Sequence, residues 1–379
     1  MPYLCADPPL TVRDLSGFGT RLGGGGVGHQ IPGRTVFFNS GRAALWGALR
    51  ALGVGRGDRV LLPAYLCQSV VSPVLTLGAA ADFYPIDRNL GPDLTALEAS
   101  VGPATRAIVL IHYFGFAGPV RALQRLCERR NVALIEDCAH ALFSRHGERL
   151  LGSFGAAAIF SPWKSLPLPD GGILAINRPD LEMPELGAAA PWTTTLARLA
   201  YRALGTVEMA AGWSPRLALL QRPGLRHDLH DRTSGAAVRV QRGSSVAWRL
   251  LGLAQPEGVV ARRREHWSRL LEASSNLSWG RPLFGRLPEG VCPLGFPLVV
   301  EERDRWRDRL LSIGVNVRTY WEHLPSIVAT DRFPDAAWLR DRILVLPVHQ
   351  GLRSSQVAWL AETLPTLSRR KGHAALAHR

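Results

Sequence analysis

The sequence predicts an α/β protein, in which a mostly parallel sheet has helices on both faces and a smaller α+β domain follows at the C-terminal end. Three observations lead to this prediction. Short apolar runs alternate with amphipathic helical segments over the first half of the chain. Acidic residues stand where some of these runs end, at the edge where open α/β sheets bind ligands. The pattern breaks after Asn177 and returns as a mixed pattern from about residue 246.

The chain of 379 residues is long for a single core, so we expect two domains. We place an N-terminal arm at 1–35, a large domain at 36–245 and a small domain with a basic tail at 246–379. Residues 184–245 are interpreted as irregular helices and linkers. The four-glycine run of the arm precedes no GK[ST] and is therefore not a P-loop.

Composition describes an ordinary globular protein, with 46% hydrophobic and 20% charged residues. No apolar run is long enough to span a membrane and the N-terminus lacks a signal pattern, so we expect a cytoplasmic protein. The net charge of +14 favours an anionic partner. Because the arginines are dispersed and no aromatic-interleaved basic stripe occurs, we expect a small anionic substrate, and neither nucleic acid nor membrane.

A metal site is not expected. The five cysteines are scattered and form no CxxC pair or Cys/His cluster. The segment HDLHD allows a metal interpretation through His227 and His230, whose spacing can place both on one helix face. We rank it below the interpretation without metal.

The stretch around Lys164 is the most informative part of the chain. A buried strand over 132–135 ends in Glu136-Asp137, and a second apolar run over 156–160 leads into Ser-Pro-Trp-Lys. The chain holds 45 Lys and Arg residues, of which only two are lysines, Lys164 and Lys371. Arginine cannot replace lysine where a neutral amine must attack a carbonyl, because the guanidinium stays protonated.

A nucleophilic lysine forms Schiff bases, and pyridoxal phosphate (PLP) enzymes need that lysine together with an acid that faces the pyridine nitrogen. Lys164 and Asp137 could have these two roles. The alternative is a lysine retained by drift in an arginine-rich chain.

The motifs IEDCAHA and GSFGAAAIFS, followed by a lysine and a Gly-Gly turn, resemble the DegT/StrS family of PLP-dependent sugar aminotransferases, which have PLP fold-type I. The resemblance runs from about residue 36 to 365 and is most specific over 134–172. It implies that Asp137 faces the pyridine nitrogen, His140 lies near the phenolic oxygen, Ser161 reaches the phosphate and Lys164 forms the Schiff base. The family usually has four or five residues between that serine and the lysine, whereas only Pro162 and Trp163 stand there in this chain.

A phosphate site is expected at a helix N-terminus near residue 40. Asn39-Ser40 is a good helix cap, and the following apolar residues recur with helical spacing. Backbone N–H groups at such an N-terminus suit a phosphate. Ser40, Gly41 and Arg42 resemble the S-G-T-x-A-L cradle of the family, with arginine in place of threonine.

The resemblance leaves other residues open. An aromatic side chain usually stacks on the PLP ring in this family. Tyr65 is near that position, whereas the closest simple alignment gives Cys67. Two further residues are candidates on the substrate side of the site. His112 would act through residues that touch the substrate, and Arg318 would bind a carboxylate or phosphate. The N-x-R-[ML] segment that reaches the neighbouring subunit's cofactor has no convincing match.

By this resemblance the chain is a homodimeric, PLP-dependent aminotransferase. It would move an amino group from glutamate or glutamine to a keto group, that of a nucleotide-linked keto-sugar, in secondary-metabolite or polysaccharide biosynthesis. Two alternatives stay open. One is another PLP reaction, such as dehydration, decarboxylation or a natural-product coupling. The other is a non-catalytic PLP-binding protein.

Overall fold

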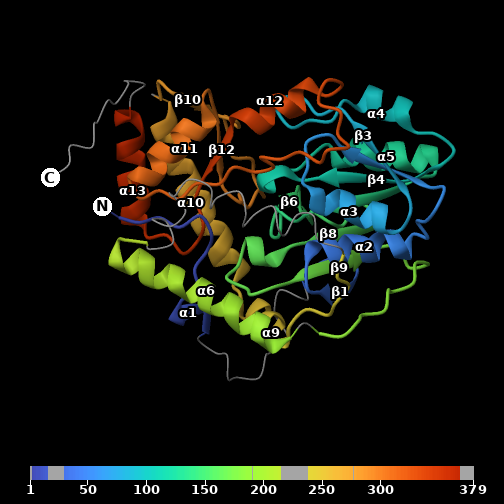
Figure 1. The fold of residues 1–379 in the computed structure, drawn as a ribbon, viewed down its shortest axis with the longest axis horizontal. Helices are drawn as coiled ribbons and strands as arrows, with labels where there is room; N and C mark the ends of the chain where they lie inside the picture. Colours follow the sequence, from blue (N-terminus) through green and yellow to red (C-terminus); the bar gives the residue numbers. More distant parts are fainter. Residues whose placement is uncertain (1, 16–29, 190, 215–237, 276, 368–379) are drawn as a thin grey trace.

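The computed structural model describes residues 2–15, 30–189, 191–214, 238–275 and 277–367. A seven-stranded sheet with the order β1-β9-β8-β5-β4-β2-β3 forms its centre (Figure 1). Parallel pairing joins β3, β2, β4, β5 and β8, and only β9 runs against its neighbours β8 and β1. The predicted mostly parallel sheet is therefore confirmed. The strands are β1 (Arg34–Phe38), β2 (Arg59–Pro63), β3 (Ala80–Tyr84), β4 (Thr105–Ile111), β5 (Ala133–Asp137), β8 (Ala157–Phe160) and β9 (Gly172–Ile176).

The helices that connect these strands bury an apolar stripe against the sheet. In α2 (Gly41–Ala51) the buried residues include Ala44, Leu45 and Ala48, and the helix packs on β8 and β9. The Ser40 hydroxyl accepts a hydrogen bond from the Ala43 N–H at 3.2 Å, so the predicted cap is confirmed. The other connecting elements are α3 (Gln68–Thr76), α4 (Leu94–Ser100), the 3₁₀ turn η2 (Tyr113–Gly115), α5 (Val120–Arg130), the hairpin β6 (Arg145–His146) with β7 (Arg149–Leu150), and η3 (Pro162–Lys164).

The C-terminal part contains a separate antiparallel sheet with the order β10-β11-β12. Of its helices, α11 and α13 lie at one end of the molecule, whereas α12 lies near β3 of the large sheet (Figure 1). The stretch after Gly314 forms two isolated bridges, Val315 with Leu4 and Arg318 with Val345. The elements are α9 (Ser245–Leu253), α10 (Pro256–Ser274), β10 (Gly280–Pro282), β11 (Phe296–Val300), α11 (Arg303–Ser312), α12 (Pro334–Arg342), β12 (Ile343–Leu346), α13 (Ser354–Thr363) and η4 (Leu364–Thr366).

Two segments differ from the sequence interpretation. The region expected to hold irregular helices contains a regular helix of 20 residues, α6 (Trp192–Ala211). The N-terminal arm, which includes α1 (Val12–Leu15), packs against the C-terminal part: the Leu4 N–H donates to the Gly314 carbonyl, and the Asn316 N–H donates to the Leu4 carbonyl, both at 2.9 Å. The glycine run, the HDLHD segment and the basic tail lie outside the described residues. Among the described residues, no helix is both long and apolar enough to cross a lipid bilayer.

The Gly-Gly turn brings β9 against the start of α2. Gly171 has a φ of +131°, and a Cβ added at Gly172 would overlap the carbonyl oxygen of Ser40. The Gly171 N–H donates to the Asn39 carbonyl at 3.1 Å. The turn therefore needs glycine at 172, because the two backbones touch there.

We predict that Gly172→Ala lowers the free energy of unfolding by about 2 kcal/mol or more, because the methyl group forces β9 away from α2. Gly55→Ala is the matched control, since a Cβ at Gly55 meets nothing within 4 Å. Urea unfolding of both variants measures the effect. Equal stability of the two would contradict the close approach.

Candidate active site

Two titratable side chains stand at the carboxyl ends of neighbouring parallel strands. Asp137 ends β5, where it pairs with Ile111 on β4 and Ile159 on β8. Lys164 ends η3, the short turn that follows β8. Because β5 and β8 run in the same direction, both residues lie at one edge of the sheet, the edge where such sheets bind ligands.

Burial shifts both groups toward their neutral forms. It lowers the pKa of the Lys164 amine, and the nearby Cys67 and Asp137 offset only part of this effect. Burial also raises the pKa of the Asp137 carboxyl, although the Lys164 charge and a 2.9 Å hydrogen bond from the Ala139 N–H oppose the rise. The lysine thus has a larger neutral, nucleophilic fraction than an exposed lysine at the same pH.

His140 lies in the same neighbourhood, among aromatic rings of the C-terminal part. Its ring stacks on Trp321 with a centroid distance of 5.4 Å and meets Tyr320 edge-on at 4.9 Å. Burial, together with the charges of Lys164 and Arg318, holds the pKa of this imidazole well below its usual value. The ring is therefore neutral at pH 7.

The N-terminus of α2 meets the strand end before Lys164. A Cβ at Gly41 would lie 3.3 Å from the Ser161 Cβ and 3.4 Å from its hydroxyl oxygen. Ser40 caps the helix here, and Arg42 donates to the Ser69 hydroxyl at 2.9 Å. A helix N-terminus, hydroxyl groups and a guanidinium together match the chemistry of a phosphate site.

Tyr65 and Cys67 occupy different environments. Tyr65 is fully buried, donates its hydroxyl to the Tyr320 carbonyl at 3.3 Å, and packs edge-on against Trp321 at 4.6 Å. Cys67 is half-buried at the N-cap of α3 and interacts electrostatically with Lys164 and Arg42.

His112 is fully buried, with both ring nitrogens at hydrogen-bond distance from protein groups. Its Nε2 lies 3.0 Å from Glu136, and the Gly118 N–H donates to its Nδ1 at 3.1 Å. Neither nitrogen is therefore left for a substrate.

The Glu136 carboxylate holds the loop that precedes β8. It accepts backbone N–H groups of Gly152 at 2.8 Å, Phe154 at 2.6 Å and Gly155 at 2.8 Å. His112, Glu136 and Cys138 place potential metal-ligand atoms within 4.8 Å of one another. The carboxylate of Glu136 and the imidazole of His112, however, already have the hydrogen-bond partners named above.

Arg318 forms an ion pair with Asp7 of the arm, and Nη1 of Arg202 on α6 lies 3.8 Å from the same carboxylate oxygen. Sequence reasoning predicted only Arg318 of these three. It also missed Trp321 and Arg263. The fully buried Arg263 donates to the carbonyl of Ser165, which follows the lysine, at 2.8 Å. No local motif marks these residues, because their partners come from distant segments.

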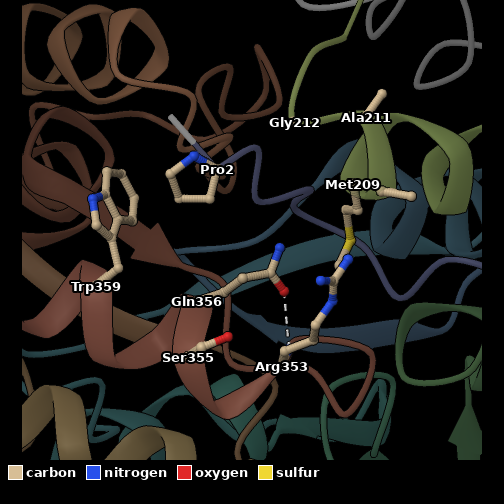
Figure 2. A pocket seen from close by; sticks show the side chains of 9 residues that line it. Pro2, Met209, Ala211, Gly212, Arg353, Ser355, Gln356 and Trp359 are labelled. Carbon is tan, nitrogen blue, oxygen red and sulfur yellow. Dashed lines mark hydrogen bonds between the residues drawn. The ribbon is translucent and has the colours of Figure 1, made fainter.

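A cavity of ≈ 330 Å³ lies elsewhere, between the C-terminal end of α6 and the first turns of α13 (Figure 2). Met209, Arg353 and Trp359 line it, beside Pro2 of the arm. The backbone N–H of Arg353 donates to Gln356 at 2.9 Å, the dashed line of Figure 2. None of the predicted site residues lines this cavity, so we do not assign the chemistry to it.

The fold is that of the PLP-dependent aminotransferases of fold-type I. The model of the DegT/DnrJ/EryC1/StrS aminotransferase family matches residues 33–187. The chain is a PLP-dependent aminotransferase.

Relatives with known names agree with this assignment. A dTDP-4-dehydro-2,3,6-trideoxy-D-glucose 4-aminotransferase of Saccharopolyspora spinosa is 29% identical over 342 residues, which cover 87% of this chain and 83% of that protein. The aminotransferase TlmJ of Streptoalloteichus hindustanus is 24% identical, with a TM-score of 0.64 and coverage of 96% and 92%. DesV of S. venezuelae is 23% identical, with a TM-score of 0.66 and coverage of 94% and 90%. The two structures share the fold of this chain.

We predict that Glu136→Gln lowers the free energy of unfolding by about 2–3 kcal/mol at pH 7, because an ionised acceptor of several buried hydrogen bonds is lost. Burial by itself would raise the pKa of this carboxyl, but His112 and the backbone N–H groups outweigh it and leave the pKa below its usual value. The contribution of the Glu136 charge to the free energy of unfolding is therefore fully present above the unfolded-state pKa of about 4.3. It is lost as pH falls through the lower pKa of the folded state.

Urea unfolding of both proteins between pH 7 and about pH 3 checks this expectation, and the stability difference should stay level down to about pH 4.3 and shrink below it. Glu98→Gln is the control, because Glu98 pairs with Arg129 and Arg130 on the surface, where ion pairs contribute little. A difference that stays constant with pH would contradict the role of the charge.

Proposed function

We propose that this enzyme moves an amino group from glutamate or glutamine to the keto group of a nucleotide-linked sugar, in secondary-metabolite or polysaccharide biosynthesis. The observation that carries the proposal is the buried Lys164 amine with a lowered pKa, at the same sheet edge as the buried Asp137. The relative from Saccharopolyspora spinosa, which is named for its action on a dTDP-linked keto-sugar, supports the acceptor class. The net charge of +14 also suits a diphosphate-bearing substrate.

The residues at the strand ends fit PLP, which supplies an electron sink and a reactive carbonyl when bound. In this proposal Lys164 holds the cofactor covalently, and after release its amine carries a proton to and from the donor's α-carbon. The lowered pKa serves both tasks, because the amine must be neutral to attack a carbonyl and to accept a proton.

Asp137 would face the ring nitrogen. In the protein without the cofactor, burial raises the pKa of the Asp137 carboxyl. The positive charge of a protonated ring would act in the opposite direction and favour the carboxylate form. The neutral His140 would stand near the phenolic oxygen, with Trp321 fixing the plane of its imidazole.

The phosphate would lie at the N-terminus of α2, where Ser40, Gly41, Arg42 and Ser161 meet. Backbone N–H groups, hydroxyls and the positive end of the helix dipole then share its charge. Between the two candidates for the ring face we choose Cys67, because it interacts electrostatically with Lys164 whereas Tyr65 packs against Trp321. His112 would act only through Glu136.

Another PLP-dependent reaction is the alternative. It is favoured by the short spacing of two residues between Ser161 and Lys164, which is fewer than the family usually has. A dehydration, decarboxylation or coupling would turn over without a net change of cofactor form. The absorption spectrum of the purified protein before and after addition of glutamate separates the two classes. We expect loss of the aldehyde-form band and appearance of the amine-form band, and turnover with an unchanged band would favour the second class.

We predict that Lys164→Ala abolishes the cofactor linkage that borohydride traps, while PLP still binds noncovalently. Lys164→Arg should behave in the same way, because it keeps the charge but not the neutral amine. Peptide mass spectrometry after reduction provides the measurement. A covalent adduct in either variant would remove Lys164 from this role.

We predict that Asp137→Asn retains PLP but lowers the rate of the glutamate half-reaction by about 10³-fold or more, because an amide cannot stabilise a protonated ring. Stopped-flow absorbance measures the rate, and Asp180→Asn, which changes an exposed carboxylate, is the control. A rate within a few-fold of the unchanged protein would argue that Asp137 does not face the ring nitrogen.

We further propose that the protein is a cytoplasmic homodimer. Exposed apolar side chains on one face of α6, among them Trp192, Leu196 and Val207, support a second copy as the covering partner. Light scattering should give a mass near 83 kDa, about twice the chain mass of 41.4 kDa. A monomer at micromolar concentration would contradict this.

A further inference from the structure

The N-terminal arm places a carboxylate between two guanidinium groups. Arg318 forms an ion pair with Asp7, and Arg202 Nη1 lies 3.8 Å from the same Asp7 oxygen. Over the described ranges of the chain, Asp7 is the only carboxylate within ion-pair distance of either arginine. Two cations therefore share one anion, and the cluster keeps an excess positive charge that suits a further carboxylate.

This cluster adjoins the lysine. The charge of Arg318 acts on both Lys164 and His140, and lowers the pKa of each. Arg202 donates to the carbonyl of Trp163, the residue before Lys164, at 2.8 Å. A carboxylate bound to Arg318 would thus be within reach of the groups that we assign to the chemistry.

Exposure distinguishes the two arginines. The Arg318 side chain retains 30% of its accessible surface and that of Asp7 retains 25%, whereas Arg202 retains 8%. Arg318 is therefore the arginine that a ligand from solution can reach. Arg202 is fixed by its bond to the Trp163 carbonyl and can keep attracting Asp7.

The arm does not depend on Asp7 for its position. On one side, the backbone of Leu4 exchanges hydrogen bonds with Gly314 and Asn316. On the other side, the Leu10 N–H donates to the Arg202 carbonyl at 3.3 Å, and the Thr206 hydroxyl donates to the Leu10 carbonyl at 2.5 Å. The Asp7 side chain can therefore leave Arg318 while the flanking backbone stays in place.

We propose that Asp7 is an internal counter-ion that occupies Arg318, where the carboxylate of the amino donor binds, and that the donor carboxylate displaces Asp7 from Arg318 while Arg202 keeps attracting it. The inference rests on the proposed function and deepens it. Exchange of one carboxylate for another conserves the charge balance around Arg318. The ligand class is a small carboxylate, an amino acid in one half-reaction and a keto acid in its reverse. Displacement costs part of the binding free energy, so the internal carboxylate weakens donor affinity.

The first test uses the full-length, PLP-loaded enzyme with Asp7→Asn. Without the competing carboxylate, the dissociation constant for glutamate, from the concentration dependence of the half-reaction, should fall by about tenfold. Arg318→Gln should raise it by about tenfold or more and leave affinity for the keto-acceptor unchanged. Asp14→Asn is the matched control: Asp14 lies on the same arm, and within the described residues it accepts hydrogen bonds from Thr11 alone, so the constant should not change.

The second test requires no reaction. Glutarate, an unreactive dicarboxylate, is titrated into the cofactor-free protein, and binding is followed by calorimetry. We expect tighter binding to Asp7→Asn than to the unchanged protein, and loss of binding in Arg318→Gln. This pattern would support the inference even if the unchanged enzyme gave no half-reaction with glutamate, an outcome that would reject only the proposed function.

Three results would overturn the inference. One is an unchanged or weaker affinity of Asp7→Asn for both glutamate and glutarate. Another is undiminished glutarate binding in Arg318→Gln. The third is a loss in Arg318→Gln that affects only the keto-acceptor. If Asp7→Asn does not fold, the Arg318→Gln measurements decide the question by the same criteria.

Discussion

The chemistry of this protein depends on the burial of charged groups at one edge of a parallel sheet. Parallel strands end together, so Asp137 on β5 and Lys164 after β8 lie at one edge of the sheet although 27 positions separate them in the sequence. In water both would be ionised at pH 7. Burial moves each pKa toward the neutral form, and this gives the lysine its nucleophilic character.

The surrounding structure fixes the positions of these two groups. Glu136 secures the loop between β5 and β8 through three backbone hydrogen bonds, and thereby the spacing of the two strand ends. Arg263, on α10, holds the carbonyl of the residue that follows Lys164. The close contact of Gly172 with Ser40 sets the start of α2 against β9. A site of this kind requires such support, because small displacements of catalytic groups cost much of the rate.

The arm and the C-terminal part complete the environment of the lysine. Trp321 and Tyr320 cover His140, and Asp7 meets Arg318 and Arg202 next to the lysine. Residues from the two ends of the chain thus surround one sheet edge. In the function proposed above, groups that the large sheet does not supply would recognise the donor.

The sequence by itself determined the parallel sheet, the helix at 41–51 with its serine cap, and the importance of the segment from Glu136 to Gly172. These features are local: apolar periodicity, a capping residue and a rare lysine are visible within short windows. The sequence did not determine α6, because the helix has apolar residues on its exposed face as well as polar and charged residues on its buried face, such as Arg202 and Glu208.

Tertiary structure alone decided which side chains meet. It enclosed His112 with Glu136 and paired Arg318 with Asp7 across 311 positions of sequence. Such pairings depend on electrostatics and packing between segments that are distant in the chain. No local pattern contains this information, because each partner is an ordinary residue in its own segment.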